Sequence, residues 1–350
     1  MVDKATRAER AVVAAAVQLE ANVGDVATNL ARIERLVDDA CAKGARLVAM
    51  PEFCTTRVCF DPRVHDAVLP PDNAALDLFK RLAARHRCWL GGSMLIADGD
   101  AIYNRYHFVE PDGRVHLHDK DLPTMWENAF YGPGADDGVF DTGLGRVGAA
   151  VCWEVIRTQT VRRMLGRVDV AVTGTHWWTL PANWGHLVTR SLASLGQFNR
   201  YLAENAPSEF ARRLGAPVLQ ASHCGRFRGG FLVAPHLPWA VPYDTEFVGC
   251  TQIVDAEGHV VAQRRAQEGP GVVVAPIAVE ATAPRVPLES RFWIPELPAL
   301  LHAYWHHQNA CGAAYYRRHG RALGLAAARR HTRRGEATPR EAFRGDGFRG

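Results

Sequence analysis

Short apolar runs alternate with amphipathic segments along most of this 350-residue chain, and the alternation restricts the fold more than any other feature. Buried strands are expected at 11–18, 47–50, 88–96, 147–151, 168–172, 217–222 and 271–279. Helices are expected after the capping residue Asp25, and at 74–85, 158–165 and 187–206. Two hairpin patterns, 103–118 around Pro111-Asp112-Gly113 and 248–263, interrupt the alternation. The pattern therefore predicts an α/β protein with mixed β-sheets covered by helices, and argues against a purely parallel doubly wound sheet.

No linker rich in Gly, Ser or Pro separates two halves, so we expect one domain over residues 1–300. Residues 301–350 are expected to form a C-terminal extension, helical at 300–314 after Pro298 and followed by a basic tail. The tail holds much of the net charge of +4, and such a segment could bind nucleic acid or anionic lipid. We favour a solvated, disordered tail instead, and the near-neutral body predicts no nucleic-acid partner.

The overall composition, 47% hydrophobic and 22% charged residues, is typical of a globular protein. The longest apolar run, 11–17, is too short to cross a membrane, and the charged N-terminus lacks the apolar core of a secretory signal. We therefore expect a cytoplasmic protein with no membrane partner. Eight scattered cysteines show neither C-x-x-C nor zinc-site spacing, so most are expected to be buried thiols.

Three reactive residues, Glu52, Lys120 and Cys152, each directly follow an apolar run. Reactive groups gather at strand ends because the sheet fixes their positions there. A thiolate can attack carbon, a desolvated carboxylate can take the thiol proton, and an ammonium can stabilise developing negative charge. Each residue alone also has a plain structural reading, as a helix cap, a surface charge or a core filler. Their combination indicates a covalent hydrolase.

The sequence motifs around these residues strengthen that hypothesis. Met50-Pro51-Glu52-Phe53, His118-Asp119-Lys120-Asp121-Leu122-Pro123-Thr124 and Val151-Cys152-Trp153-Glu154 resemble, in order, the three signatures of the nitrilase or carbon–nitrogen hydrolase superfamily. The resemblance runs from about residue 12 to residue 279. It implies an αββα sandwich, a homodimer or higher homo-oligomer, and a Glu-Lys-Cys triad that uses no metal and no organic cofactor.

The resemblance also implies roles for individual residues. Glu52 would be the general base, Lys120 the electrostatic stabiliser, and Cys152 the nucleophile that forms a thioimidate or thioester. The backbone N–H of Trp153 would be a second donor to the oxyanion. Glu127 would orient Lys120 or position the substrate, although it also fits a carboxylate at a helix N-terminus.

The substrate expected from the resemblance is a small-molecule nitrile or amide. The spacing from Lys120 to Glu127 and the sequence Cys152-Trp153-Glu154 look like the nitrilase branch, whereas Val155-Ile156-Arg157 departs from it.

A second set of candidates, with supporting or substrate-binding roles, consists of Glu154, His176, Trp177, Trp178 and Trp184. The tryptophans could line an aromatic pocket or simply pack under a loop or at an interface. Arg157 could hold a substrate carboxylate, but a surface ion pair is the interpretation we favour. Two alternatives stay open: an acyltransferase that uses the same thioester, and a non-catalytic scaffold protein, which the intact triad argues against.

Overall fold

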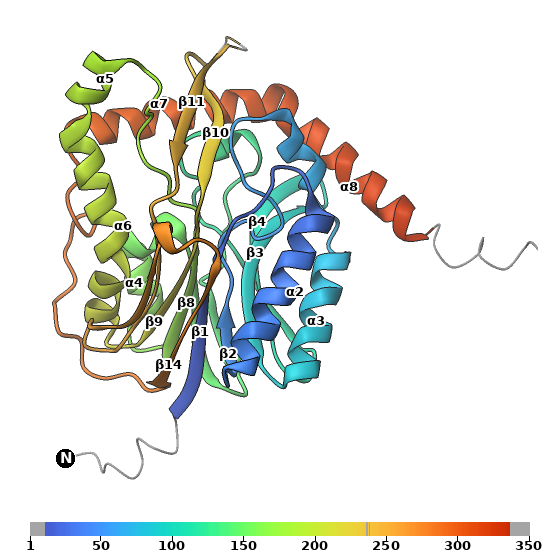
Figure 1. The fold of residues 1–350 in the computed structure, drawn as a ribbon, viewed down its shortest axis with the longest axis vertical. Helices are drawn as coiled ribbons and strands as arrows, with labels where there is room; N and C mark the ends of the chain where they lie inside the picture. The colour runs from blue at the N-terminus through green and yellow to red at the C-terminus, as the bar shows by residue number, and fades with distance from the viewer. Residues whose placement is uncertain (1–10, 236, 238, 337–350) are drawn as a thin grey trace, which may run out of the picture.

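The computed structural model describes residues 11–235, 237 and 239–336, with the strands and helices shown in Figure 1. The strands are β1 (Ala11–Leu19), β2 (Leu47–Ala49), β3 (Trp89–Asp98), β4 (Ala101–Val109), β5 (Val115–Asp119), β6 (Val139–Thr142), β7 (Gly145–Val151), β8 (Val170–Thr175), β9 (Val218–His223), β10 (Arg226–Leu232), β11 (Ala240–Glu246), β12 (Gly249–Val254), β13 (Val260–Arg265) and β14 (Gly271–Ala278). The α-helices are α2 (Val26–Ala42), α3 (Ala74–His86), α4 (Thr158–Met164), α5 (His186–Ser191), α6 (Ala193–Leu214), α7 (Ala299–Tyr315) and α8 (Arg321–Glu336). Short 3₁₀ segments are η1 (Pro62–Ala67), η2 (Met125–Ala129), η3 (Cys152–Ile156) and η4 (Ala266–Glu268), and η5 (Tyr316–Gly320) is a π-helical turn.

Twelve strands of the described chain form one hydrogen-bonded sheet that divides into two half-sheets. One half contains β14, β1, β2, β3, β4 and β5, and the other contains β6, β7, β8, β9, β12 and β13. Strand β1 pairs along its length with β14 and in its middle with β2. It pairs with β9 only at its end, where Gln18 lies opposite Ser222 and Leu19 opposite His223. The halves therefore join at one end and face each other elsewhere.

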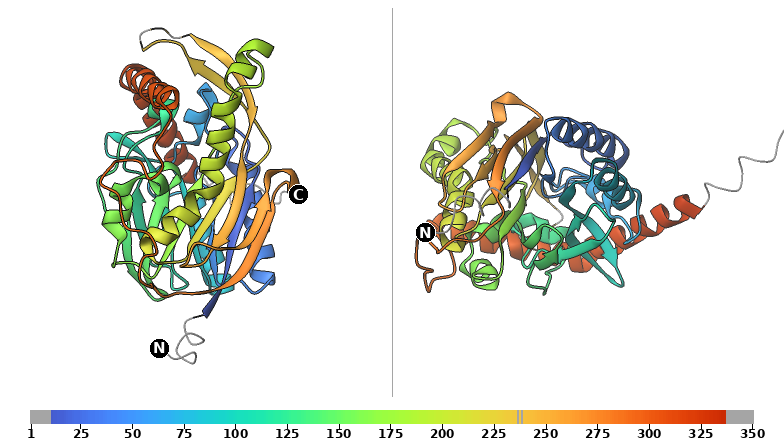
Figure 2. Two further views of the ribbon diagram at one scale, coloured as in Figure 1. Left: turned by 90° about the vertical axis from the view of Figure 1, so that its left-hand side faces the viewer. Right: turned by 90° about the horizontal axis from the view of Figure 1, so that it is seen from below.

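Helices cover the outer faces of the two half-sheets, with α2 and α3 on one side and α4 and α6 on the other (Figures 1 and 2). Period-two alternation along β1 separates the two packing layers. Ala15 and Val17 pack with α2 and α3, whereas Ala14 and Ala16 pack with residues of the opposite half-sheet. This is the predicted αββα sandwich.

The first predicted hairpin is confirmed as β4 and β5, with Gly113 at φ 87° in the turn, and the second is β12 and β13. Asp25 caps α2 by accepting a hydrogen bond from the Thr28 backbone N–H. The prediction missed β6 and the separate β10–β11 hairpin. It also ended the long helix at residue 206, before Pro207, whereas α6 continues to Leu214 because Phe210 and Leu214 are buried there.

The helical extension begins at Ala299, directly after Pro298 as predicted, but it is longer than predicted. Helix α7 continues through η5 into α8, and the helices run across the upper end of the molecule (Figure 1). The expected disorder is therefore wrong for residues 316–336. Buried Ala327 and Ala328 and a hydrogen bond from the Ile102 N–H to the Tyr316 hydroxyl hold this segment. The remainder of the predicted tail, 337–350, lies outside the described residues.

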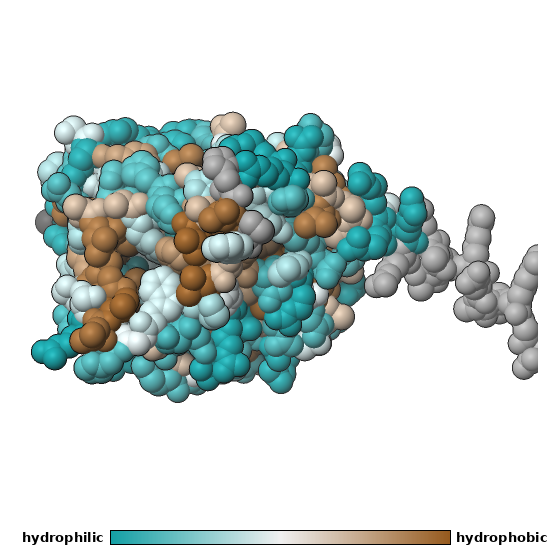
Figure 3. Space-filling view, turned by 90° about the horizontal axis from the view of Figure 1, so that it is seen from above, coloured by the Kyte–Doolittle hydropathy of each residue, from teal (hydrophilic) through white to brown (hydrophobic). Residues whose placement is uncertain are grey.

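The upper face carries apolar patches over α5 and the tip of the β10–β11 hairpin (Figure 3). Exposed apolar side chains in these elements include Leu187 and Val188 of α5 and Leu237 and Trp239 of the hairpin tip. Among the described residues, no helix is both long and apolar enough to cross a membrane. All eight cysteines are buried free thiols, as expected.

Candidate active site

Glu52 lies in the turn that follows β2, and its main chain is fixed from several sides. The His223 Nε2 atom lies 2.6 Å from the Glu52 carbonyl oxygen, and Ser93 Oγ accepts a hydrogen bond from the next N–H, that of Phe53, at 3.0 Å. Gly174 of β8 passes so close that a Cβ there would lie 2.3 Å from the Glu52 nitrogen. The carboxylate therefore projects from a rigid, fully buried segment.

Lys120 follows β5 and lies between two carboxylates. Its Nζ atom donates to Glu52 Oε1 at 2.8 Å and to Glu127 Oε2 at 2.6 Å. All three side chains are fully buried. Burial opposes the charged ammonium, but the two carboxylates outweigh it and hold the pKa of Lys120 well above its usual value. This places a permanent positive charge in a site closed to solvent.

Glu127 lies in η2 and is held by three donors on one oxygen. Oε2 accepts from Lys120, from the Tyr131 hydroxyl at 2.5 Å and from the Thr124 N–H at 3.0 Å. The last bond is the helix-start contact that the sequence allowed as an alternative. The two readings of Glu127 are therefore compatible, because the carboxylate caps its turn and pairs with Lys120 together.

Cys152 occupies the junction between β7 and η3, with φ at 55°. This left-handed conformation is costly for a residue with a Cβ and is typical of strained functional turns. Glu154 stabilises the turn by accepting the Val151 N–H at 2.6 Å on Oε2. Glu154 is thus a supporting residue whose two oxygens are occupied by protein donors.

The pKa values in this site separate the base from the nucleophile. Burial raises the pKa of Glu52 to about 7, against the opposing effect of Lys120. Burial, with the nearby Glu52 charge, raises the pKa of the Cys152 thiol well above its usual value. The resting site therefore contains a neutral thiol beside a carboxylate that titrates near neutrality, as general base catalysis requires.

A second buried charge network lies beneath the Cys152 turn. His118 lies between Asp136, 2.5 Å from Nδ1, and Glu154, 2.9 Å from Nε2. Burial opposes its charge, but the two carboxylates outweigh that effect and raise the pKa of His118 to about 10. The other oxygen of Glu154 accepts the Asp121 N–H at 3.0 Å, so this network connects the segments that carry Lys120 and Cys152.

Arg157 belongs to the same network, which corrects the expected surface ion pair. Its guanidinium is fully buried, donates to Asp121 Oδ1 at 2.5 Å and lies over the Trp293 ring at 5.8 Å. Burial follows because the 287–297 segment passes over it, with the Ile294 N–H bonded to the Ile156 carbonyl. Arg157 therefore has a structural ion-pair partner.

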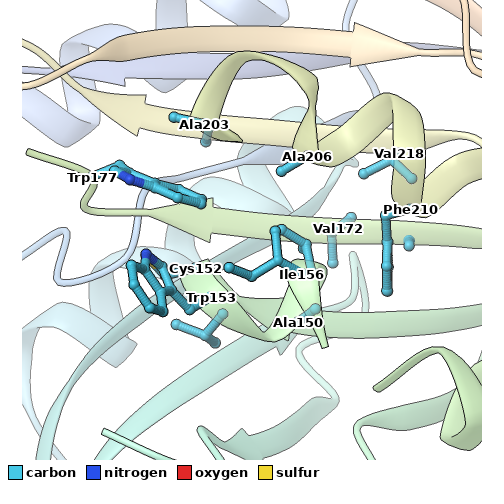
Figure 4. Close-up of a cluster of buried hydrophobic side chains, with 14 of the residues drawn as sticks. Ala150, Cys152, Trp153, Ile156, Val172, Trp177, Ala203, Ala206, Phe210 and Val218 are labelled. Atoms are coloured by element: carbon cyan, nitrogen blue, oxygen red, sulfur yellow. The ribbon is translucent and has the colours of Figure 1, made fainter. Parts of the chain in front are cut away.

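Two tryptophans of the predicted aromatic cluster, Trp177 and Trp178, are buried in the protein core, and Trp184 is partly buried against it. Trp177 lies against Trp153, 5.7 Å between ring centroids, and donates to Asn199 of α6 at 2.9 Å (Figure 4). Trp178 stacks on Trp126 at 4.3 Å, and Trp184 packs against Tyr243 at 5.6 Å. Trp177 and Trp178 thus fit the packing interpretation.

His176 is buried among aromatic rings, and its Nε2 atom accepts the Val58 N–H at 3.1 Å. Burial holds the pKa of its imidazole well below the usual value, so the ring is neutral. The backbone of His176 hydrogen-bonds the Cys152 sulfur, which lowers the thiol pKa. His176 thus supports the site through its main chain.

Sequence reasoning gave no role to Asn104, Tyr131 or His223. Asn104 donates to Glu52 Oε1 at 2.8 Å. Its sequence signal was its place at the opening of the first hairpin, and that of His223 was its place at a strand end. Among the described residues, no group of three or more His, Cys, Asp or Glu side chains is arranged to hold a metal ion.

Comparison of the sequence with known proteins shows the family to which the chain belongs. The family model described as carbon-nitrogen hydrolase matches residues 13–285, so the chain belongs to the carbon–nitrogen hydrolase family. The bifunctional nitrilase/nitrile hydratase NIT4A of Nicotiana tabacum is 28% identical over 151 residues, covering 37% of this chain and 43% of that protein. The omega-amidase NIT2-A of Xenopus laevis is 29% identical over 143 residues, covering 36% of this chain and 50% of that protein. The aligned region thus spans half or less of these relatives.

The fold is also similar to a solved amidase. A point mutant of the amidase from Nesterenkonia sp. AN1, which shows Michael addition of acrylamide at its active-site cysteine, superposes with a TM-score of 0.54. Its sequence is 19% identical, and the match covers 84% of this chain and 99% of that chain. At this identity the similarity describes the fold.

Proposed function

We propose that this protein hydrolyses a non-peptide carbon–nitrogen bond of a small nitrile or amide through a covalent intermediate on Cys152. The observation that carries the proposal is the buried Lys120 ammonium, held between Glu52 and Glu127 beside the Cys152 turn. Such a site provides a base, a fixed cation and a nucleophile in a water-poor enclosure, where electrostatic stabilisation is strongest.

For an amide, Glu52 takes the thiol proton as the Cys152 sulfur attacks the carbonyl carbon. The Lys120 ammonium and the Trp153 N–H stabilise the resulting oxyanion. The protonated Glu52 then gives its proton to the leaving nitrogen, ammonia departs, and a thioester remains. Water, deprotonated by Glu52, attacks this thioester, and the acid leaves as the thiol is reprotonated.

For a nitrile, the first addition gives a thioimidate, and the proton from the thiol ends on the former nitrile nitrogen. Water then adds to the thioimidate carbon, and expulsion of ammonia gives the same thioester. The two routes therefore share their second half. Similarity to both a nitrilase/nitrile hydratase and an omega-amidase supports the general reaction and leaves both substrate classes in the proposal.

The first experiment measures ammonia release from a panel of aliphatic and aromatic nitriles and amides. We expect turnover with the parent protein and none with Cys152→Ala. Cys88→Ala is a matched control because Cys88 is equally buried but precedes β3 at the end away from the site. Equal turnover by Cys152→Ala and the parent would refute the mechanism.

The second experiment uses acrylamide as a probe, because an amidase of this fold carries its adduct on the active-site cysteine. Intact-mass measurement and peptide mapping should place one adduct on Cys152. The Glu52→Gln variant, which lacks the proposed base, tests whether Cys152 is still alkylated when turnover is lost. Absence of both turnover and adduct would favour the non-catalytic scaffold.

Self-association, the lack of a nucleic-acid partner and a cytoplasmic location stay predictions.

A further inference from the structure

We propose that Asn309 of α7 is a positioning residue for the reaction: it holds the turn that carries Glu127, and through Glu127 it sets the place of Lys120. This inference rests on the proposed function. It assigns a role to a helix outside residues 13–285, the part of the chain that matches the family.

Asn309 reaches the turn through one oxygen. Its Oδ1 atom accepts the Met125 N–H at 2.7 Å and the Asn128 side-chain amide at 3.1 Å. The same Asn128 amide donates to the Met125 carbonyl at 2.8 Å and to the Pro123 carbonyl at 3.2 Å. Asn309 therefore binds both the first residue of η2 and the side chain that closes the turn.

The turn needs such support because its first residue is strained. Met125 has φ at 58°, in the left-handed region that a residue with a Cβ rarely adopts. The N–H groups at the start of a helical turn have no partner within the turn. Asn309 supplies that partner for Met125, so its loss releases the turn from an unfavourable conformation.

Movement of this turn would affect Lys120 in two steps, first by moving Glu127 and then by moving the ammonium that Glu127 holds. Glu127 lies two residues after Met125, and the same carboxylate oxygen accepts the Thr124 N–H and the Lys120 ammonium. A shift of η2 therefore shifts one of the two carboxylates that hold Lys120. The other, Glu52, lies on a separate segment and would not follow.

Helix α7 is placed firmly enough to act as a support. A Cβ on Gly312 would lie 2.8 Å from the Asn128 Cβ and 3.0 Å from the Ala129 nitrogen, so the helix and the turn are in close contact. In η5, which continues α7, a Cβ on Gly320 would lie 2.1 Å from the Ala129 carbonyl oxygen. The buried Gln308 side chain also donates to the Leu232 carbonyl of β10 at 2.7 Å.

The test compares Asn309→Ala, Asn309→Asp and His306→Ala in the full chain. The aspartate keeps an oxygen that can accept both hydrogen bonds, and His306 is an exposed residue on the same helix. We expect Asn309→Ala to lower kcat about tenfold to a hundredfold, as for other losses of positioning, with KM changed less. Asn309→Asp should recover most of kcat, and His306→Ala should match the parent.

The pH profile distinguishes positioning from loss of stability. Burial raises the pKa of Glu52, Lys120 lowers it, and Glu127 raises it by less than Lys120 lowers it. A shift that draws the Lys120 ammonium away together with Glu127 should therefore move the acid limb of kcat/KM to higher pH in Asn309→Ala. The rate of Cys152 alkylation by iodoacetamide, followed by mass spectrometry, should show the same shift even if no turnover substrate is found. Unchanged kcat, alkylation rate and pH profile in Asn309→Ala would overturn the proposal, as would failure of Asn309→Asp to recover either rate. Failure of the proposed function would appear differently, as lack of turnover in the parent.

Discussion

The side-chain amide of Asn104 donates to Glu52 Oε1 at 2.8 Å, the same oxygen that accepts the Lys120 ammonium. The other oxygen, Oε2, is buried and has no conventional hydrogen-bond partner among the described residues. The two oxygens of this carboxylate therefore differ, since one is held by two donors and the other is free to receive a proton.

Glu52→Gln should remove the base while keeping the shape of the site. The glutamine carbonyl can still accept from Lys120 and Asn104, so the melting temperature should change little. Loss of general base catalysis should lower kcat by about 10²- to 10⁴-fold. Ammonia-release kinetics and thermal unfolding test this pair of expectations, and a kcat within about threefold of the parent would contradict the assigned role.

The pH dependence of the parent follows from the raised pKa of Glu52, which burial brings to about 7. A base must be unprotonated, so kcat/KM should be low near pH 5 and should rise with pH to a half-maximum near pH 7. Initial rates in buffers of constant ionic strength measure this limb. A flat profile between pH 5 and pH 8 would show that Glu52 does not titrate in the free enzyme.

The buried His118 predicts a pH-dependent stability. Its pKa is raised from 6.5 to about 10 in the folded protein by Glu154 and Asp136, against the effect of burial. This stabilisation is fully present below pH 6.5 and is lost as the pH rises through 10. The free energy of unfolding in urea should therefore fall between pH 7 and pH 9 in the parent, and His118→Gln should flatten that fall. Equal slopes in the two proteins would contradict the assigned charge.

Two glycine substitutions should have opposite effects. Gly174→Ala places a Cβ 2.3 Å from the Glu52 nitrogen and 2.6 Å from the Pro51 carbonyl carbon, so β8 or the Glu52 turn must move. We expect a destabilisation of about 3 kcal/mol or more and loss of turnover. Gly196→Ala in α6 meets only Leu180 Cδ1 at 3.7 Å and should stabilise the protein by about 0.5–1 kcal/mol. Chemical unfolding of both variants provides the comparison.

Much of the fold could be predicted because its signals are local. Turn residues such as Gly113, the Asp25 cap and the apolar strands each act within a few residues, and the structure confirms them. Glu52, Lys120 and Cys152 could be selected because strand ends of a sheet converge. The helix predicted at 187–206 ended too early, because α6 continues through Pro207 to Leu214, where burial of Phe210 and Leu214 outweighs the local penalty of the proline.

The remaining features depend on contacts between distant segments. The Arg157 environment is set by a segment more than a hundred residues later, and the Asn309 contact with Met125 spans 184 positions. A basic, alanine-rich sequence after residue 315 also looks disordered until its small residues are packed against β4 and η1. Sequence patterns cannot show which distant surfaces meet.

The small side chains Ala14, Ala16 and Ala49, in the layer between the two half-sheets, act as a spacer. Glu52 follows a strand of one half-sheet and Cys152 follows a strand of the other. The distance between the base and the nucleophile therefore depends on the thickness of that layer. Among the described strands, the two halves pair with each other only at the end of β1, so widening the layer would tilt the half-sheets apart about that joint. A larger residue in the layer would then lower the catalytic rate before it unfolds the protein. The spacing between the two half-sheets is therefore itself under functional constraint.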